Sequence, residues 1–161
     1  EETPKYKDWK QNNPDTYIVS AFFIGEDYFP KSNQWQLDFY EPNKDRVVSF
    51  VYGVDSPLKE EEIFKKSKDK ISELILDVIK VDLEKAIDNV EKIKKTKHPG
   101  ETATKKLFIL QVLEGKSVWN ITYISSSFNI LNIKIDAISG EVVSENFSSV
   151  LSFKDKELSK G

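Results

Sequence analysis

The stretch that decides the fold is residues 118–143, VWNITYISSSFNILNIKIDAISGEVV. Large apolar residues alternate with polar ones along two parts of it: Trp119, Ile121 and Tyr123, then Ile133 and Ile135. A period of two is typical of strands that bury one face. The stretch therefore predicts two strands, over 118–124 and 129–137.

A tight turn is expected at the end of this stretch. Gly140 reaches positive φ without steric cost, so Ser139-Gly140 predicts a two-residue reversal into a third strand over 141–147. Asp side chains commonly accept backbone N–H groups in such turns. We therefore expect structural roles for Asp136 and Gly140, and we do not interpret Asp136 as a catalytic carboxylate.

Working outward, six further segments have the composition of strands and turns. Residues 106–113 predict a strand that leads into 118–124 through a turn at Glu114-Gly115-Lys116. Earlier in the chain, residues 16–24, 35–39 and 47–54 are rich in β-branched and aromatic residues, and 41–45 forms a turn between the last two. Short connections between consecutive strands favour an antiparallel meander.

The apolar period changes to that of a helix between residues 57 and 97. Ser56 is a candidate N-cap, Pro57 suits a first helical turn, and Asp82 is a second candidate cap. No Gly or Pro separates the two parts, so one kinked helix and two helices are both open. We favour two helices that meet near Lys80-Val81, the second ending at His98-Pro99-Gly100. The expected fold class is α+β, with antiparallel meanders packed against these helices as one continuous sheet or two curved ones.

The two halves of the chain resemble each other. Residues 35–39, WQLDF, match 119–123, WNITY, at an offset of 84 (119 minus 35). Similar β-hairpins also produce such matches, so both explanations stay open. We favour a duplicated unit, with an N-terminal half over 1–79 and a C-terminal half over 80–161, which share one compact domain or form two.

Composition excludes several classes of function. Lys plus Arg is 24 and Asp plus Glu is 27, a net charge of −3, so the strongly basic footprint of a nucleic-acid-binding protein is absent. The chain has no cysteine and one histidine, which excludes disulfides, thiol catalysis and a multi-histidine metal centre. No apolar run approaches the roughly 20 residues of a membrane helix. We expect no metal site, no cofactor and no nucleic-acid partner.

No set of residues indicates a catalytic site. His98 follows a lysine-rich helix end, where we expect it to be exposed to solvent and not catalytic. The carboxylates of Glu26-Asp27 and Glu60-Glu61-Glu62 are adjacent in sequence, which is typical of solvated charges. Lysines at 65–70 and 92–97 are interleaved with acidic residues, which favours pairing along a helix face over contact with nucleic acid.

Most aromatic residues fall at inward strand positions, with three exceptions. Trp9, Tyr28 and Phe29 lie in polar, loop-like surroundings. They are either part of the core or an exposed binding patch. The sequence otherwise leaves the binding residues unknown.

The second half resembles a PepSY domain over about residues 80–145. The similar pieces are DLEKAI at 82–87, LFILQVL at 107–113, WNITY at 119–123 and IKIDAISGEVV at 133–143. PepSY domains occur in the propeptides of secreted metallopeptidases and as free-standing extracytoplasmic proteins. The resemblance implies duplicated PepSY-like (cystatin-like) units, although residues 16–79 have YGVDS at 52–56 in place of the Asp-Ala-x-x-Gly turn.

These observations predict a non-catalytic, extracytoplasmic module that binds protein or peptide. The resemblance implies a secreted, periplasmic or cell-surface location and a peptidase or another envelope protein as partner. The strand at 141–147 is a candidate edge that accepts an added strand. A small apolar-ligand carrier is the alternative.

Because the chain contains no methionine, we expect that a leader or lipid anchor was removed before Glu1, or that the boundary is arbitrary.

Overall fold

The computed structural model describes residues 4–25, 35–51, 57–62 and 71–150, with only the backbone described for 57–62. Its helices are α1 (Pro4–Asn12), α2 (Leu83–Lys97) and the short 3-10 helix η2 (Leu76–Val78). Its strands are β1 (Tyr17–Gly25), β2 (Gln36–Glu41), β3 (Arg46–Val51), β4 (Pro57–Glu62), β5 (Ala103–Leu113), β6 (Lys116–Ser125), β7 (Asn129–Asp136) and β8 (Val142–Ser149). The fold is α+β, which confirms the expected class.

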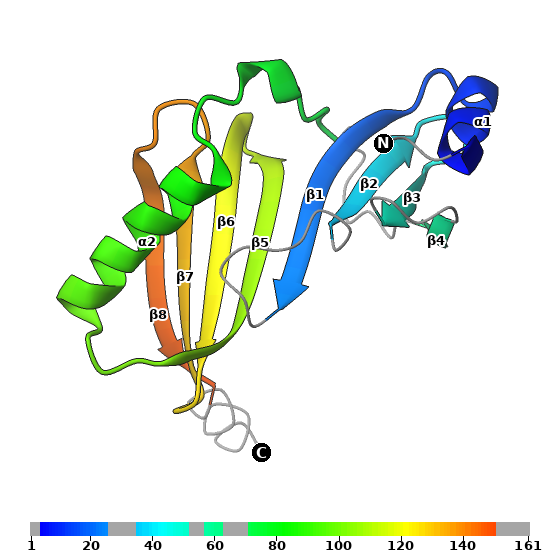
Figure 1. Cartoon of the computed structure of the whole chain (residues 1–161). Helices are drawn as coiled ribbons and strands as arrows, with labels where there is room; N and C mark the ends of the chain where they lie inside the picture. Colours follow the sequence, from blue (N-terminus) through cyan, green and yellow to red (C-terminus); the bar gives the residue numbers. More distant parts are fainter. Residues whose placement is uncertain (1–3, 26–34, 52–56, 63–70, 151–161) are drawn as a thin grey trace, which may run out of the picture.

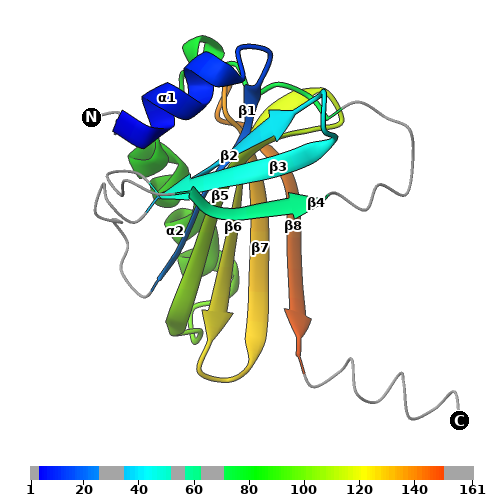
Figure 2. The same ribbon diagram turned by 90° about the vertical axis from the view of Figure 1, so that its right-hand side faces the viewer.

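The strands form one antiparallel sheet of eight, in the order β4-β3-β2-β1-β5-β6-β7-β8. The sheet twists so strongly that β3 and β4 cross in front of β5–β8 when the molecule is viewed from the side (Figures 1 and 2). Of the two arrangements expected, one continuous sheet is therefore correct.

The order of elements repeats along the chain. Each half has a helix followed by four strands, and the first strands of the two halves, β1 and β5, pair at the centre of the sheet. Leu37 pairs with Phe50 in the first half, as Ile121 pairs with Ile133 in the second. The offset is therefore 84 (121 minus 37) in one strand and 83 (133 minus 50) in the next. Descent from a duplicated unit, and the boundary at residues 79 and 80, stay predictions.

Both helices cover the same face of the sheet. Lateral pairing runs from Leu37 through Ala21 and Leu110 to Trp119, and laterally paired side chains point to one face. Leu37 packs in the cluster under α1, and Trp119 packs in the cluster under α2. The larger cluster buries Phe108, Ile121 and Ile133 against Ala86, Ile87 and Val90 of α2.

The expected first helix, from residue 57 to about 80, is wrong for the described residues. Residues 57–62 form β4, which pairs with β3, and 71–81 has no helix except η2; residues 63–70 lie outside the described residues. In residues 71–81, contacts with distant strands stabilise an extended conformation more than the helical spacing of apolar residues favours a helix. Leu74 is 1% exposed, and its N–H donates to the carbonyl of Ile18, while the N–H groups of Lys80 and Val81 both donate to the carbonyl of Ala137.

The second expected helix is correct. Asp82 caps α2 by accepting the N–H of Lys85 at 2.8 Å, as the sequence predicted. Lys94, Lys95 and Lys97 occupy the last turn, where positive charge suits the negative end of the helix dipole. His98 closes the helix by donating its N–H to the carbonyl of Lys94.

The turn after β7 uses the expected residues, but it is longer than the two-residue reversal expected at Ser139-Gly140, because β7 ends at Asp136 and β8 begins at Val142. The Asp136 carboxylate accepts the N–H groups of Ile138 and Ser139, each at 2.8 Å. Gly140 has a φ of +81°, and its N–H donates to the Asp136 carbonyl. These hydrogen bonds confirm the structural role of Asp136.

Candidate binding surface at the β8 edge

Strand β8 is at the edge of the sheet, where β7 is its one neighbour among the described strands. Four large apolar side chains along it and just after it are exposed: Val142 (46%), Val143 (45%), Phe147 (41%) and Val150 (38%). An edge with unpaired backbone groups and apolar side chains is a template for another strand. The expected edge at 141–147 is therefore in place.

Hydrogen bonding to β7 fixes which backbone groups of β8 point outward. The Val150 N–H donates to the Phe128 carbonyl at 2.8 Å, and Asn129 pairs with Ser149. In an antiparallel ladder, hydrogen-bonded pairs alternate with pairs that are not hydrogen-bonded. The N–H and C=O groups of Glu145, Phe147 and Ser149 therefore point away from β7, and those of Ser144, Asn146 and Ser148 point toward it.

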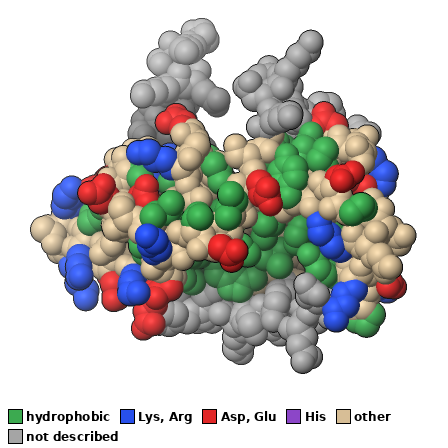
Figure 3. All heavy atoms as spheres, turned by 90° about the horizontal axis from the view of Figure 1, so that it is seen from above, with side chains coloured by type: hydrophobic (Ala, Val, Ile, Leu, Met, Phe, Trp, Pro, Cys, Tyr) green, Lys and Arg blue, Asp and Glu red, His purple; other side chains and the backbone are tan. Residues whose placement is uncertain are grey.

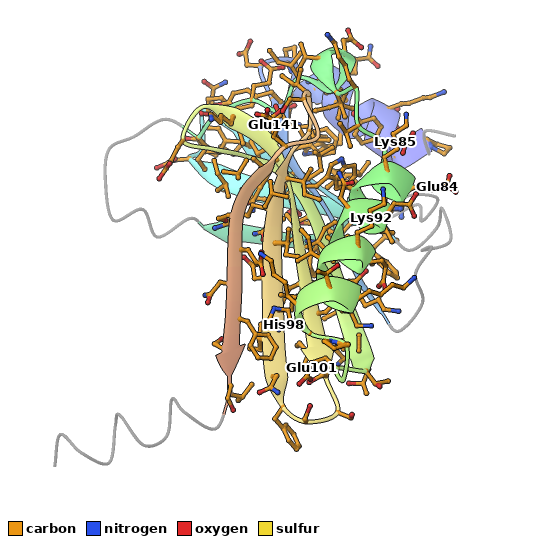
Figure 4. The ribbon with its side chains drawn as sticks, turned by 90° about the vertical axis from the view of Figure 1, so that its left-hand side faces the viewer. Glu84, Lys85, Lys92, His98, Glu101 and Glu141 are labelled. Atoms are coloured by element: carbon orange, nitrogen blue, oxygen red, sulfur yellow. The ribbon has the colours of Figure 1, made fainter. Side chains whose placement is uncertain are left out.

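The end of α2 holds β8 in place on the helix-covered face. Lys97 Nζ donates to Glu145 Oε2 at 2.6 Å, and the His98 ring stacks on Phe147 with centroids 4.1 Å apart and planes 19° apart. Figure 4 shows His98 at the lower end of α2, close to β8, with Glu101 beyond it and Glu141 at the far end of the strand. These contacts give the edge a fixed position, which lowers the entropic cost of binding there.

The expectation that His98 is exposed to solvent is wrong. Its side chain is only 16% exposed, and its Nε2 is buried, has no hydrogen-bond partner among the described residues, and lies 3.6 Å from Glu145 Oε1. The reason is tertiary, because β8 passes the end of α2 and supplies Phe147 as a stacking partner. Nothing in the sequence around residue 98 indicates that contact.

Glu145 is a charged group beside this contact. The hydrogen bond from Lys97 lowers the pKa of the Glu145 carboxyl below its usual value of 4.5, despite the opposing effect of burial. Hydrogen bonds from Ser125, Ser127 and Asn129 lower the pKa of Glu101 in the same direction. Both carboxylates are therefore ionised at neutral pH, and neither is set up as a proton donor.

The opposite face of the sheet carries polar side chains that satisfy one another. Asp38 accepts hydrogen bonds from Ser20 at 2.6 Å, Gln36 at 2.8 Å and Ser49 at 2.6 Å. On the other half, the Asn132 amide donates to Asn120 at 2.7 Å and to Thr122 at 2.8 Å. Groups paired in this way stabilise the sheet and leave little for acid–base chemistry.

On the same face, Asn146 is different. Its side chain is exposed, and no hydrogen bond joins its amide to another described residue. It pairs across the ladder with Asn132, whose own amide is already engaged. Asn146 therefore offers both a donor and an acceptor at the middle of the edge strand.

Two of the hollows in the described part of the chain bear on the choice between a binding edge and a ligand carrier. One lies between the α1–β1 connection and the β2–β3 turn, has a volume of about 270 Å³ and is lined by Asp15, Glu41, Asn43 and neighbouring polar residues. Glu41 is 2% exposed there and is held by Lys44 at 2.7 Å and Arg46 at 2.5 Å. The other, under Phe147, holds only about 10 Å³. Neither is a closed apolar cavity of ligand size.

The end of the molecule that carries η2 also exposes apolar side chains. Ile75 and Leu76 are each 53% exposed, and Val78 is 38% exposed. Figure 3 looks onto this end and shows apolar side chains gathered among acidic and basic ones.

Within the described residues there is no group of three potential metal ligands, and no helix there is long and apolar enough to cross a membrane.

The three aromatic residues without an expected strand have different outcomes. Trp9 lies on α1 and packs against Phe39 and Phe50, with centroids 5.7 and 5.0 Å away, so it belongs to the core. Tyr28 and Phe29 lie outside the described residues, as do Glu26, Asp27 and the lysines at 65–70. The structure thus does not bring the three together as a described patch.

Comparison with known proteins supports the fold. No family model and no curated protein matches this chain. A crystal structure from Clostridium difficile 630, described as a putative lipoprotein, is similar with a TM-score of 0.54 over 88% of this chain and 89% of that chain. The two sequences are 14% identical. At that identity the likeness shows a shared α+β architecture and nothing finer.

Proposed function

We propose that this chain is a non-catalytic, extracytoplasmic module that binds a protein or peptide by accepting a strand at β8. The observation that carries the proposal is the exposed edge, with outward backbone groups at Glu145 and Phe147 and apolar side chains at both of its ends. Main-chain hydrogen bonds to an added strand supply affinity, and alternate side chains supply specificity.

Two further findings support the location and the absence of catalysis. The structural neighbour is described as a putative lipoprotein, and lipoproteins are anchored at the cell envelope; the PepSY-like pieces of the sequence point the same way. The carboxylates of Asp38, Glu41 and Glu145 are each held by hydrogen bonds or ion pairs. We propose a peptidase of the envelope as the partner whose activity this module modulates.

The test is site-specific photo-crosslinking. A photoreactive side chain replaces Ser144 on β8, and a matched control replaces Thr122 on β6, an inner strand that shares the same face. After exposure to the envelope fraction of the source organism, the Ser144 variant is expected to capture an envelope protein, and the Thr122 variant is not. A captured peptidase is then assayed with and without this chain.

Phe147→Pro is the edge-blocking variant, and Phe147→Leu is its control. The Phe147 N–H points outward, so proline removes a donor to the added strand without breaking a backbone bond to β7. Both variants lose the ring that stacks on His98, but leucine keeps the N–H. Capture through Ser144 should fall at least tenfold more in Phe147→Pro than in Phe147→Leu. Equal capture at Ser144 and Thr122, or capture of cytosolic proteins alone, would contradict the proposal.

A further inference from the structure

We infer that the strand accepted at β8 carries a neutral amide or hydroxyl side chain directly opposite Asn146, where it continues a row of polar side chains that crosses the sheet. The inference rests on the proposed function, because it uses the same edge and names the chemistry of the segment that binds there. The occupant is an extended segment of another protein.

The polar row consists of Thr122, Asn132 and Asn146, on the face of the sheet opposite to the helices. Thr122 on β6 pairs with Asn132 on β7, and Asn132 pairs with Asn146 on β8. The Asn132 amide donates to Thr122 Oγ1 at 2.8 Å and to Asn120 Oδ1 at 2.7 Å. Side chains of neighbouring strands are therefore hydrogen-bonded to one another from β6 as far as β7.

Asn146 is the outermost member of the row, and no hydrogen bond joins its amide to another described residue. Its side chain is exposed, whereas Thr122 and Asn132 are half-buried because a strand lies on each side of them. A strand added beyond β8 withdraws the Asn146 amide from water in the same way. Since a desolvated amide without a partner is destabilising, the edge disfavours a strand whose opposing side chain forms no hydrogen bond.

The backbone determines which residue of the added strand faces Asn146. The N–H and C=O groups of Glu145 and Phe147 point outward, and the ladder is regular here because the register shift of β8 lies before Ser144. An added antiparallel strand bonds to Glu145 and Phe147, which leaves Asn146 in the pair between them that is not hydrogen-bonded. In such a pair the Cα atoms are about 4.5 Å apart and the side chains are closest.

The chemistry of an amide selects a neutral polar partner. Asn146 offers one group that donates and one that accepts, whereas an ionised carboxylate only accepts and an ammonium group only donates. An amide or a hydroxyl group does both. Within the sheet, Asn132 already has one partner of each kind, the amide of Asn120 and the hydroxyl group of Thr122.

The residues on either side of this position face the helix-covered side of the sheet. The Phe147 ring stacks on His98 and is still 41% exposed, so an apolar residue opposite Phe147 buries apolar surface. The Glu145 carboxylate, which Lys97 holds, disfavours an acidic residue opposite it. Because the strands are antiparallel, the bound segment has, from its N-terminal side, an apolar residue, an amide or hydroxyl residue, and a residue that is not acidic.

Two labelled synthetic peptides test this chemistry with the full chain. In the first, Val alternates with Ala, a single central Asn replaces one Ala, and Lys at each end keeps the peptide in solution. The second has Leu, which is close to Asn in shape, in place of the Asn. Fluorescence anisotropy should show that the Asn peptide binds about tenfold more tightly than the Leu peptide. Equal affinities, or tighter binding of the Leu peptide, would overturn the inference.

Asn146→Leu tests whether residue 146 is the source of this preference. The variant should bind the Leu peptide at least as tightly as the Asn peptide, because the amide of the Asn peptide then has no partner. Ser148→Ala is the matched control, on the same strand and the same face, and should keep the preference of the wild type. A preference that persists in Asn146→Leu, or one that disappears in Ser148→Ala, contradicts the proposed register.

Disulfide formation measures the register directly, because the chain has no cysteine of its own. Asn146→Cys should form a mixed disulfide with a peptide that has Cys in place of its Asn, since a Cα spacing of about 4.5 Å is within the range of a disulfide. Ser148→Cys should react at least tenfold more slowly, because diagonal neighbours are about 7–8 Å apart. Equal rates for the two variants would show that residue 146 does not face the central residue of the peptide.

Failure of the inference and failure of the proposed function give different results. If the Asn and Leu peptides bind alike, and Phe147→Pro weakens both more than Phe147→Leu does, the edge accepts a strand without recognising its polar residue, which refutes the inference alone. Capture of an envelope protein through Ser144 without binding of either peptide also refutes the inference alone. If neither peptide binds and Ser144 captures no envelope protein, both are refuted.

Discussion

Asp136 shows how much one side chain contributes at the residue scale. Its carboxylate satisfies two N–H groups of the turn that leads into β8, and these bonds lower its pKa below the ordinary 3.8. Asp136→Ala is expected to reduce the free energy of unfolding by about 1 kcal/mol at pH 7. Urea denaturation measures the difference, and an unchanged midpoint would contradict the role assigned to the carboxylate.

The same contact gives a pH dependence with a definite sign. Since the folded pKa of Asp136 is lower than the unfolded value of about 3.9, the stabilisation is fully present above pH 4 and is lost as pH falls through the folded pKa. The difference between wild type and Asp136→Asn should therefore shrink below pH 4. A constant difference between pH 3 and pH 7 would rule out the charge as the cause.

Trp119 is the second residue whose effect is predictable. Its Nε1 donates to the Val81 carbonyl at 2.7 Å in the buried core, and so fixes the connection that precedes α2. Trp119→Phe leaves that carbonyl unsatisfied and should cost about 2 kcal/mol. Trp35→Phe is the control, because the Trp35 ring lies beside the Trp119 ring, with centroids 6.4 Å apart. It should lower the free energy of unfolding by less than Trp119→Phe does, as measured by thermal unfolding.

At the scale of elements, α1 acts as the lid of the smaller core. Tyr6 and Trp9 pack on Phe39, Val48 and Phe50, and α1 has no fully buried residue of its own. Trp9→Ala should destabilise the chain by about 3 kcal/mol, with amide exchange increasing first in β2 and β3. Lys7→Ala, on the exposed side of α1, is the control; equal effects would show that α1 does not hold this core.

An element could be predicted from the sequence when the interactions that stabilise it lie within a few residues of one another. The end of α2 and the turn at Asp136 were predictable, because a cap and a turn are decided within a few residues. Helix α1 was missed, because Tyr6 and Trp9, which pack on the smaller core, lie in a short segment that is otherwise mostly polar. The segment after residue 57 was wrongly predicted as a helix, because β4 pairs with β3 and Leu74 is anchored on Ile18.

At the scale of the whole molecule, the β1–β5 pair joins the two halves. Phe23 and Phe108 stack there at 5.9 Å, and Phe108 has no exposed surface. Phe108→Ala should lower the free energy of unfolding by about 3–5 kcal/mol, in one cooperative transition of both halves. Separate transitions, seen as different midpoints for tryptophan fluorescence and circular dichroism, would show that the halves unfold independently.

The candidate surface was predicted only in part. That residues 141–147 form a strand with exposed apolar side chains follows from local pattern, and the structure confirms that β8 is at the edge. That His98 stacks on Phe147, and that Glu145 is held by Lys97, depends on residues about 48 positions apart in the chain. No local pattern contains such a pairing.

The sequence by itself determined the α+β class, seven of the strands, α2 with its cap, and the role of Asp136 in the turn after β7, because periodicity and turn chemistry act between neighbouring residues. Tertiary structure alone decided that eight strands join into one sheet and that residues 57–62 add a strand to it. The physical reason is that strand pairing is chosen by contacts between distant segments, whose energy exceeds the preference of any short stretch.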